Sequence, residues 1–131
     1  MSSLEVGLKA ARQQTVNDTN AISFLGEGGP RVLATPALIM FLEMTSRDLA
    51  KAHLDPGYDT VGTHVDVKHL AASPIGMTVT FHSELIEADG RRLRFRVEAF
   101  DAKEKIAEGF HERAIINVAK FAARVAAKGR E

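Results

Sequence analysis

Three residues of types used in acid/base chemistry stand where the sequence pattern predicts burial. Thr35 opens the apolar segment T-P-A-L-I-M-F-L-E, and Glu43 ends it. His69 comes later, in V-G-T-H-V-D-V-K-H, and by alternation it shares a predicted strand face with three valines, Val61, Val65 and Val67. A hydroxyl, a carboxylate and an imidazole withdrawn from water are groups that acid/base and nucleophilic catalysis use.

Each of these residues also has a purely structural interpretation. Thr35 could serve only as a helix N-cap, and Glu43 could form a surface ion pair with Arg47 four positions on. His69 could be a core histidine whose ring is satisfied by a backbone carbonyl. The sequence alone leaves these alternatives open.

The spacing of Thr35 and Glu43 sets a geometric condition on any shared site. Eight helical residues at about 1.5 Å each separate the two by about 12 Å along the axis, so both cannot contact one carbonyl carbon. Three arrangements resolve this: Thr35 precedes the helix and the chain turns back, His69 bridges the two, or different subunits contribute them.

The helix that carries Thr35 and Glu43 is the clearest element of the sequence. Thr35 suits its N-cap, Pro36 suits its first turn, and Asp55-Pro56-Gly57 ends it. The segment from Pro36 to Leu42 is apolar all round, which predicts that the first turns are enclosed by a sheet or covered by a partner subunit.

Alternating patterns predict a sheet after the helix. Asp89-Gly90 predicts a tight hairpin between two of its strands. Residues 11–24 alternate weakly, as an edge strand does, and the tail from Ala119 predicts a short amphipathic end helix. The four strands predicted after the helix are Thr60 to Leu70, Met77 to Ala88, Arg91 to Asp101 and Ile106 to Val118.

The composition of the chain limits the classes of function that it can have. The 131 residues predict a single domain over 1–131, and a formal net charge of zero argues against nucleic acid and membrane partners. The chain has no cysteine, and no segment resembles a signal peptide or a membrane span, so we expect a cytoplasmic protein. His64 and His69 have opposite strand parity, so we expect no metal site.

The basic residues of the third predicted strand have two interpretations, and they are Arg91, Arg92, Arg94 and Arg96. They form the solvated face of a strand, or a patch for a phosphorylated ligand.

The ordered motifs A-T-P with a glutamate eight residues after the threonine, V-G-T, K-H-L-A-A-S-P-I-G and G-F-H-E-R-A-I-I-N-V resemble the acyl-CoA thioesterase group that includes the fluoroacetyl-CoA-specific thioesterases. They span residues 32–121. The resemblance implies an α+β hotdog fold, in which a curved antiparallel sheet of about five strands wraps around one long central helix.

The resemblance also implies a site and a partner. It places catalytic roles on Thr35, Glu43 and His69 and substrate binding on Gly62 and Arg113, without metal or cofactor, with coenzyme A as part of the substrate. It implies a homodimer, or a higher homo-oligomer, whose sheets join edge to edge, with active sites near the subunit interface.

The activity that this implies is hydrolysis of a small or medium acyl-CoA thioester. An enoyl-CoA hydratase of the same fold and a non-catalytic acyl-CoA sensor remain as alternatives. The aromatic lid residue of the fluoroacetyl-specific enzyme falls by spacing on Gly29, so the resemblance does not extend to fluoroacetyl selectivity.

Overall fold

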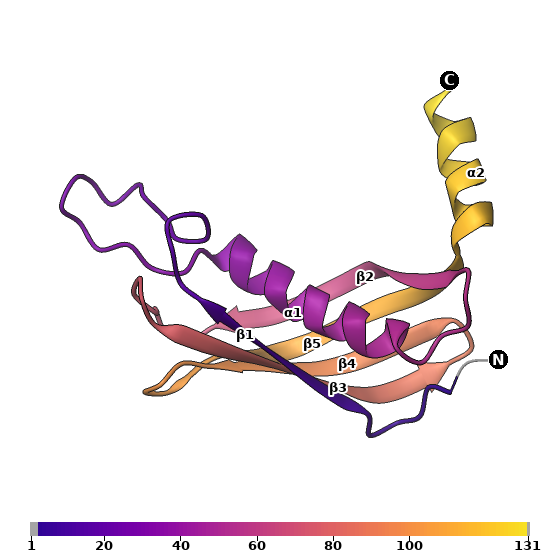
Figure 1. Ribbon diagram of the computed structural model, residues 1–131, viewed down its shortest axis with the longest axis horizontal. Coiled ribbons are helices and arrows are strands. Elements are labelled where there is room, and N and C mark those ends of the chain that lie inside the picture. The colour runs from indigo at the N-terminus through magenta and orange to yellow at the C-terminus, as the bar shows by residue number, and fades with distance from the viewer. Residues whose placement is uncertain (1–2, 131) are drawn as a thin grey trace.

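The computed structural model describes residues 3–130 and contains one sheet and two helices (Figure 1). The order along the chain is strand, helix, four strands and a final helix, as the sequence predicts. The elements are β1 (Lys9–Thr15), α1 (Thr35–Lys51), β2 (Tyr58–His69), β3 (Thr78–Asp89), β4 (Arg92–Phe100), β5 (Lys105–Asn117) and α2 (Val118–Gly129).

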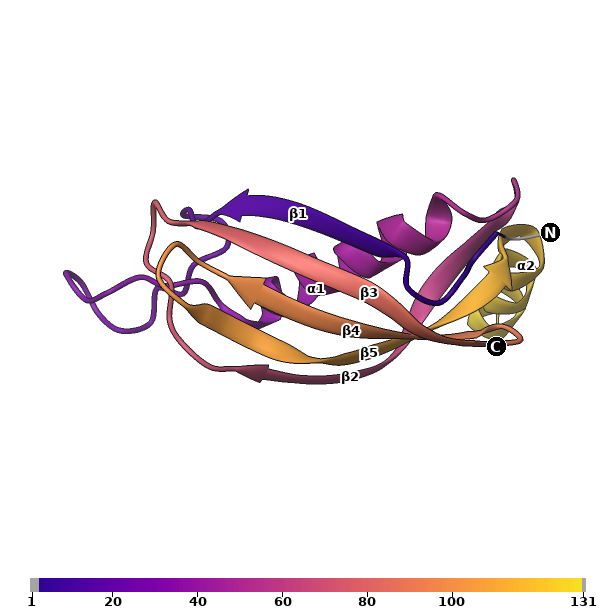
Figure 2. The same cartoon turned by 90° about the horizontal axis from the view of Figure 1, so that it is seen from below.

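The five strands form one antiparallel sheet in the order β1-β3-β4-β5-β2, so β1 and β2 are its edges. The predicted hairpin at Asp89-Gly90 is confirmed, and Gly90 has the positive φ of 62° that such a turn requires. Helix α1 lies across one face and contacts all five strands, while α2 projects from the end of β5 (Figures 1 and 2).

The first strand differs from its prediction. It covers Lys9–Thr15, whereas residues 17–24 form turns and a single bridge between Ala21 and Leu33. The side chain of Asn17 accepts hydrogen bonds from the backbone and the hydroxyl of Thr19, and this local turn ends the strand. Weak alternation could not distinguish the strand from the turn that follows it.

The core lies between α1 and the inner face of the sheet. Alternate residues of β4, including Phe95 and Val97, are fully buried, and their neighbours Arg94 and Arg96 point to the outer face. Burying each large apolar side chain contributes about 1.5–3 kcal/mol, so this layer fixes the helix on the sheet. No helix among residues 3–130 has the length and hydropathy that crossing a bilayer requires.

A β-bulge in β2 corrects the predicted face of Val61. The register between β2 and β5 shifts between Gly62 and His64, so that Val61 pairs with Ala114 and Val65 pairs with His111. His111 points into the core and Ala114 does not, so Val61 lies on the opposite face from Val65. Strict alternation fails at the bulge because one extra residue is inserted there.

Candidate active site

Thr35 contacts His69 and does not cap its helix. It is the first residue of α1, the N-cap position is Ala34, and no side chain caps the helix there. The Thr35 hydroxyl oxygen lies 2.8 Å from Nδ1 of His69, at the end of β2. The capping interpretation is therefore wrong. Thr35 is also exposed, which contradicts its expected burial.

The His69 ring has one nitrogen engaged and one without a partner. Its Nε2 is buried and has no hydrogen bond to any residue in the described part of the chain. Burial lowers the pKa of His69, so its imidazole is neutral at neutral pH. A hydroxyl against a neutral imidazole is an arrangement in which a proton can pass between the two groups.

Glu43 belongs to a different cluster, one that contains Gly62 and Arg113. Its Oε2 lies 3.7 Å from Nη1 of Arg113, and its side chain is 38% exposed. A Cβ on Gly62 would lie 2.5 Å from the same oxygen, so only glycine leaves room for this carboxylate. The structure thus brings together three of the residues that the sequence singled out.

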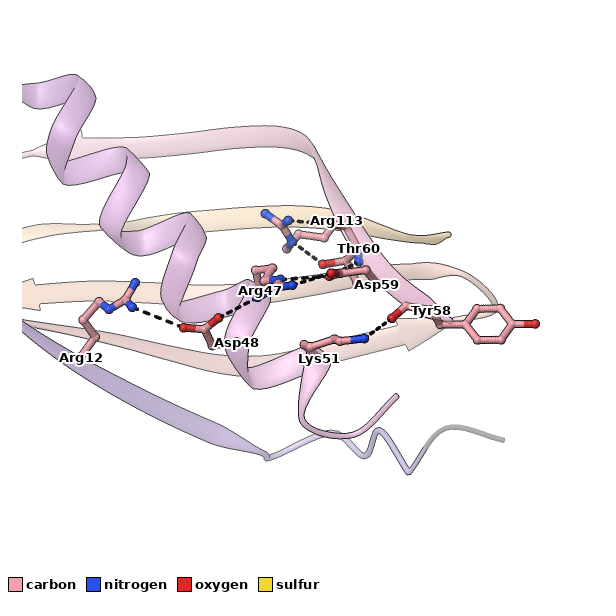
Figure 3. A network of polar contacts seen from close by, with 8 residues as sticks. All are labelled: Arg12, Arg47, Asp48, Lys51, Tyr58, Asp59, Thr60 and Arg113. Atoms are coloured by element: carbon pink, nitrogen blue, oxygen red, sulfur yellow. Dashed lines mark hydrogen bonds and ion pairs between the residues drawn. The ribbon is translucent and has the colours of Figure 1, made fainter. Parts of the chain in front are cut away.

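Arg113 is held rigidly below the carboxylate. Its side chain is almost completely buried, and it donates from Nε to the Thr60 hydroxyl and from Nη2 to the Thr60 carbonyl (Figure 3). Burial lowers its pKa, and the Glu43 carboxylate opposes that shift. The guanidinium stays charged, because an arginine side chain is not deprotonated in proteins.

His111 is a site residue that the sequence analysis missed. Its Nδ1 lies 2.8 Å from the carbonyl oxygen of His64, which can only accept, and its Nε2 lies 3.1 Å from Nη1 of Arg113, which can only donate. These contacts fix one neutral tautomer, with the proton on Nδ1. Its position two residues before Arg113 on one face of a strand was a signal that could have found it.

The surface ion pair between Glu43 and Arg47 is absent from the described contacts. Arg47 instead forms ion pairs with Asp48 and Asp59, and Figure 3 shows it directed toward Asp59 on β2. The Glu43 carboxylate is therefore free of Arg47 and faces Arg113. That orientation contradicts the simplest structural interpretation of Glu43.

The two clusters remain apart within one protomer. Thr35 lies inside the helix, so the chain does not turn back to bring it beside Glu43, and the axial separation stays at about 12 Å. The His69 side chain hydrogen-bonds to Thr35, and it makes no contact with Glu43 among the described residues. Two of the three arrangements that the spacing allowed are excluded.

A depression lies over the Glu43 cluster at the edge of the sheet. Its volume is about 370 Å³, and Met40, Met44 and Gly62 are among the residues that line it. Within residues 3–130, no group of three or more histidine or acidic side chains is arranged to hold a metal ion. The chemistry available at the depression is that of a carboxylate, a guanidinium and nearby apolar walls.

Comparison with known proteins identifies the family. The sequence model of the fluoroacetyl-CoA-specific thioesterase family matches residues 16–119. The fluoroacetyl-CoA thioesterase of Streptantibioticus cattleyicolor is 41% identical over 99 residues, which are 76% of this chain and 71% of that protein.

Solved structures agree with this result. The fluoroacetyl-CoA thioesterase FlK superimposes with a TM-score of 0.88 at 34% identity, over 96% of this chain and 98% of that one, and a threonine-to-serine variant of FlK has been solved with acetyl-CoA. A hot-dog-like protein from Thermanaerovibrio acidaminovorans has a TM-score of 0.86 at 21% identity, over 94% of this chain and 91% of that one, which supports the fold alone. The chain belongs to the fluoroacetyl-CoA-specific thioesterase family and has its hotdog fold.

Proposed function

We propose that this protein hydrolyses a small or medium acyl-CoA thioester to a carboxylic acid and free coenzyme A, with Thr35, His69 and Glu43 as its catalytic residues. The single observation that carries the residue assignment is the 2.8 Å contact between the Thr35 hydroxyl and His69. A threonine at the start of a helix ordinarily caps it, and here the hydroxyl is committed to an imidazole. Family membership supplies the reaction class.

In the proposed mechanism, Glu43 acts as a general base. It takes a proton from a water molecule while the oxygen of that water attacks the thioester carbonyl carbon. The Thr35 hydroxyl positions the carbonyl group, and the bond between carbon and sulfur then breaks. The proton held by Glu43 returns through His69 to the departing sulfur of coenzyme A. Atoms balance, because one water and one thioester give one acid and one thiol.

Two other functions use the same fold and are separated by their products. A hydratase would remove the absorbance of an enoyl-CoA without releasing thiol, and a sensor would bind an acyl-CoA without either change. The decisive assay is thiol release across acyl-CoA esters from acetyl through long-chain, aromatic and halogenated acyl groups. Release from one class supports the proposal, and no release from any ester rejects it.

The acyl group that this chain accepts is proposed to differ from fluoroacetyl. A Cβ on Gly29 would lie 2.5 Å from the backbone oxygen of Leu25, so an aromatic ring at position 29 does not fit this loop. Gly26 and Gly28 in the same loop have positive φ, at 96° and 78°. A lid without the aromatic ring leaves more room for an acyl chain.

We further propose that two copies pair through the free edge of β2. Within residues 3–130 that strand pairs with β5 alone, and an unpaired edge strand favours pairing with another strand. Met40 and Met44 on the adjacent side of α1 are 47% and 39% exposed, and Val65 on β2 is 40% exposed. Such an apolar margin beside an open sheet edge suits a homodimer interface.

This pairing would complete the active site. If β2 pairs antiparallel with its copy about Asp66, Val65 pairs with the partner's Val67, and the bulge brings the partner's Gly62 opposite His69. The Thr35–His69 pair of one subunit then approaches the Glu43 cluster of the other. That arrangement is the remaining solution to the separation of about 12 Å between Thr35 and Glu43.

Mixing two inactive variants tests the shared site. Thr35→Val removes a residue from one half of the shared site, and Glu43→Gln removes a residue from the other half. A heterodimer of the two variants therefore has one site in which both halves are intact. Random exchange of subunits makes half of the dimers mixed, and activity should return to about one quarter of wild type. A site contained within one protomer would give no recovery, and that result rejects the shared site without rejecting hydrolysis.

A further inference from the structure

A second cavity lies on the outer face of the sheet, opposite the Glu43 cluster. This outer groove has a volume of about 610 Å³, within the range of ligand pockets, and runs between β2, the turn from β3 to β4, and α2. Its apolar floor includes Val61, Ile116 and Phe121. Phe121 is the only part-buried residue of α2, so this ring attaches the helix to the groove.

The rim of the outer groove is cationic. Arg91 lines it from the turn between β3 and β4, Arg92 from the start of β4, and Arg124 from α2. Glu112 also lines the groove, but it lies 3.6 Å from Arg92, which further pairs with Glu87. Arg91 and Arg124 form no ion pair with any residue that the structure describes, so their charges remain available for an anionic ligand.

Arg124 is positioned toward the groove by the aromatic floor. Its guanidinium carbon lies 5.7 Å from the centre of the Phe121 ring, in the range of a cation–π contact. Lys120, Arg124 and Lys128 follow one another at intervals of four, and α2 contains no acidic residue, which concentrates positive charge on one side of the helix. An apolar floor with an arginine rim suits a planar ring system that carries phosphate groups.

We propose that the outer groove binds the adenosine 3′-phosphate 5′-diphosphate end of coenzyme A. This inference rests on the proposed function, because it assigns the nucleotide part of the proposed substrate. The adenine would lie on the apolar floor, and the phosphates would meet Arg91 and Arg124.

The path between the two cavities runs around the edge of the sheet. Val61 lines both the outer groove and the depression over Glu43. It also lies just outside the stretch 62–69 that the proposed dimer would pair. The pantetheine arm could therefore pass the edge of β2 at Val61 without displacing the partner strand.

The test uses a ligand that cannot be hydrolysed. Adenosine 3′,5′-bisphosphate should bind the wild-type protein in isothermal titration calorimetry, and the double variant Arg91→Gln/Arg124→Gln should bind it at least about tenfold more weakly. Arg96→Gln is the matched control, because Arg96 is an exposed arginine of the same sheet face that pairs with Glu84 and does not line the groove. Equal binding by the double variant and the wild type would overturn the assignment.

Steady-state kinetics separates this inference from the proposed function. In the double variant, KM for the acyl-CoA should rise about tenfold with kcat unchanged, while KM for the matching acyl-pantetheine should stay the same. Hydrolysis with equal KM for both substrates in the wild type would reject the groove and keep the thioesterase. If the bisphosphate binds the wild type and not the double variant, and no ester releases thiol, the outer groove remains a nucleotide site and the proposed thioesterase activity is rejected.

A membrane-binding role for α2 is a competing outcome of the same variants. The wild type could sediment with phosphatidylserine vesicles while the double variant does not, and the wild type could also fail to bind the bisphosphate. Those two results together would assign the arginines to a lipid surface and overturn the proposal.

Discussion

The Glu43 carboxylate occupies the space that a side chain on Gly62 would fill. Its Oε2 would lie 2.5 Å from a Cβ at position 62, and Nη1 of Arg113 lies 3.7 Å from the same oxygen. Gly62 thus fixes where the carboxylate can stand, although the two residues come from different elements. The family resemblance marked the glycine, and the packing gives the physical reason.

Gly62→Ala should reduce turnover with little effect on stability. The closest contact of the new methyl group is the end of the flexible Glu43 side chain, which can move away at small cost, and Cε1 of His111, 3.3 Å away, need shift only slightly. A displacement of the carboxylate by about 1 Å can lower turnover by about 100-fold. Thiol release and urea unfolding of the same preparation measure both effects. Gly129→Ala is the control, because a Cβ there meets nothing within 4 Å. Wild-type turnover in Gly62→Ala would remove the constraint from the mechanism.

Glu43→Gln should abolish most of the thiol release while the protein stays folded. The substitution keeps the shape of the side chain and removes its charge, so the proton acceptor is lost and turnover should fall by about 100-fold or more. The substitution also leaves the buried Arg113 guanidinium without its opposing carboxylate, so the free energy of unfolding should fall by about 1 to 3 kcal/mol. Glu104→Gln, an exposed carboxylate in the turn between β4 and β5 that lines neither cavity, serves as the control. Full activity in Glu43→Gln would leave Glu43 as an ion-pair partner of Arg113 and no more.

Thr35→Val should lower activity without the stability loss of a missing helix cap. Because the Thr35 side chain makes no capping hydrogen bond, the free energy of unfolding should change by about 0.5 kcal/mol or less, whereas removing a true N-cap costs about 1 kcal/mol. Thr35→Ser keeps the hydroxyl and should retain activity within about tenfold of wild type. Thr78→Val, an exposed threonine on β3, is the matched control. Equal activity of the valine and serine variants would contradict a role for the hydroxyl.

His69→Ala should lower turnover by about two to four orders of magnitude in a folded protein. The wild-type kcat/KM should also fall at acid pH, with its midpoint below the ordinary histidine pKa of about 6.5, because burial lowers the pKa of His69 and the neutral ring persists as pH falls. His82→Ala, an exposed histidine on β3, should leave turnover unchanged. Near wild-type turnover in His69→Ala would exclude it from proton transfer.

Local signals predicted most of the fold. The Thr-Pro start, the Asp-Pro-Gly stop and the Asp-Gly turn are signals that act over a short stretch of chain. Each lies within a few residues of the corresponding element boundary in the structure. The face of Val61 could not be predicted, because the bulge beside Gly62 depends on how β2 aligns with β5.

The site was predicted less completely than the fold, for a similar reason. Thr35, Glu43 and Arg113 were recognisable by motif. The partners of Glu43 were not, because they depend on where along β2 and β5 the helix α1 packs. His111 acquires its role only through its contact with Arg113, which a linear pattern does not specify. Residues that act by holding another residue in place are the ones that sequence reasoning omits.

The buried His111 predicts that the protein loses stability in mild acid. Burial lowers the pKa of His111, which is 1% exposed, so the folded state favours the neutral ring. The unfolded chain therefore binds more protons between the lowered pKa and the ordinary value of about 6.5. The stabilisation is fully present above about pH 6.5 and is lost as pH falls toward the folded-state pKa.

Urea unfolding at several pH values between 7.5 and about 5 measures this slope, which for one fully linked group is at most about 1.4 kcal/mol per pH unit. His111→Gln should be less stable at neutral pH and should show a shallower slope, because the group that titrates is gone while a side chain that can hydrogen-bond remains. An unchanged slope in His111→Gln would show that protonation of His111 is not what destabilises the fold, and would shift the acid sensitivity to His69, whose pKa is lowered in the same direction.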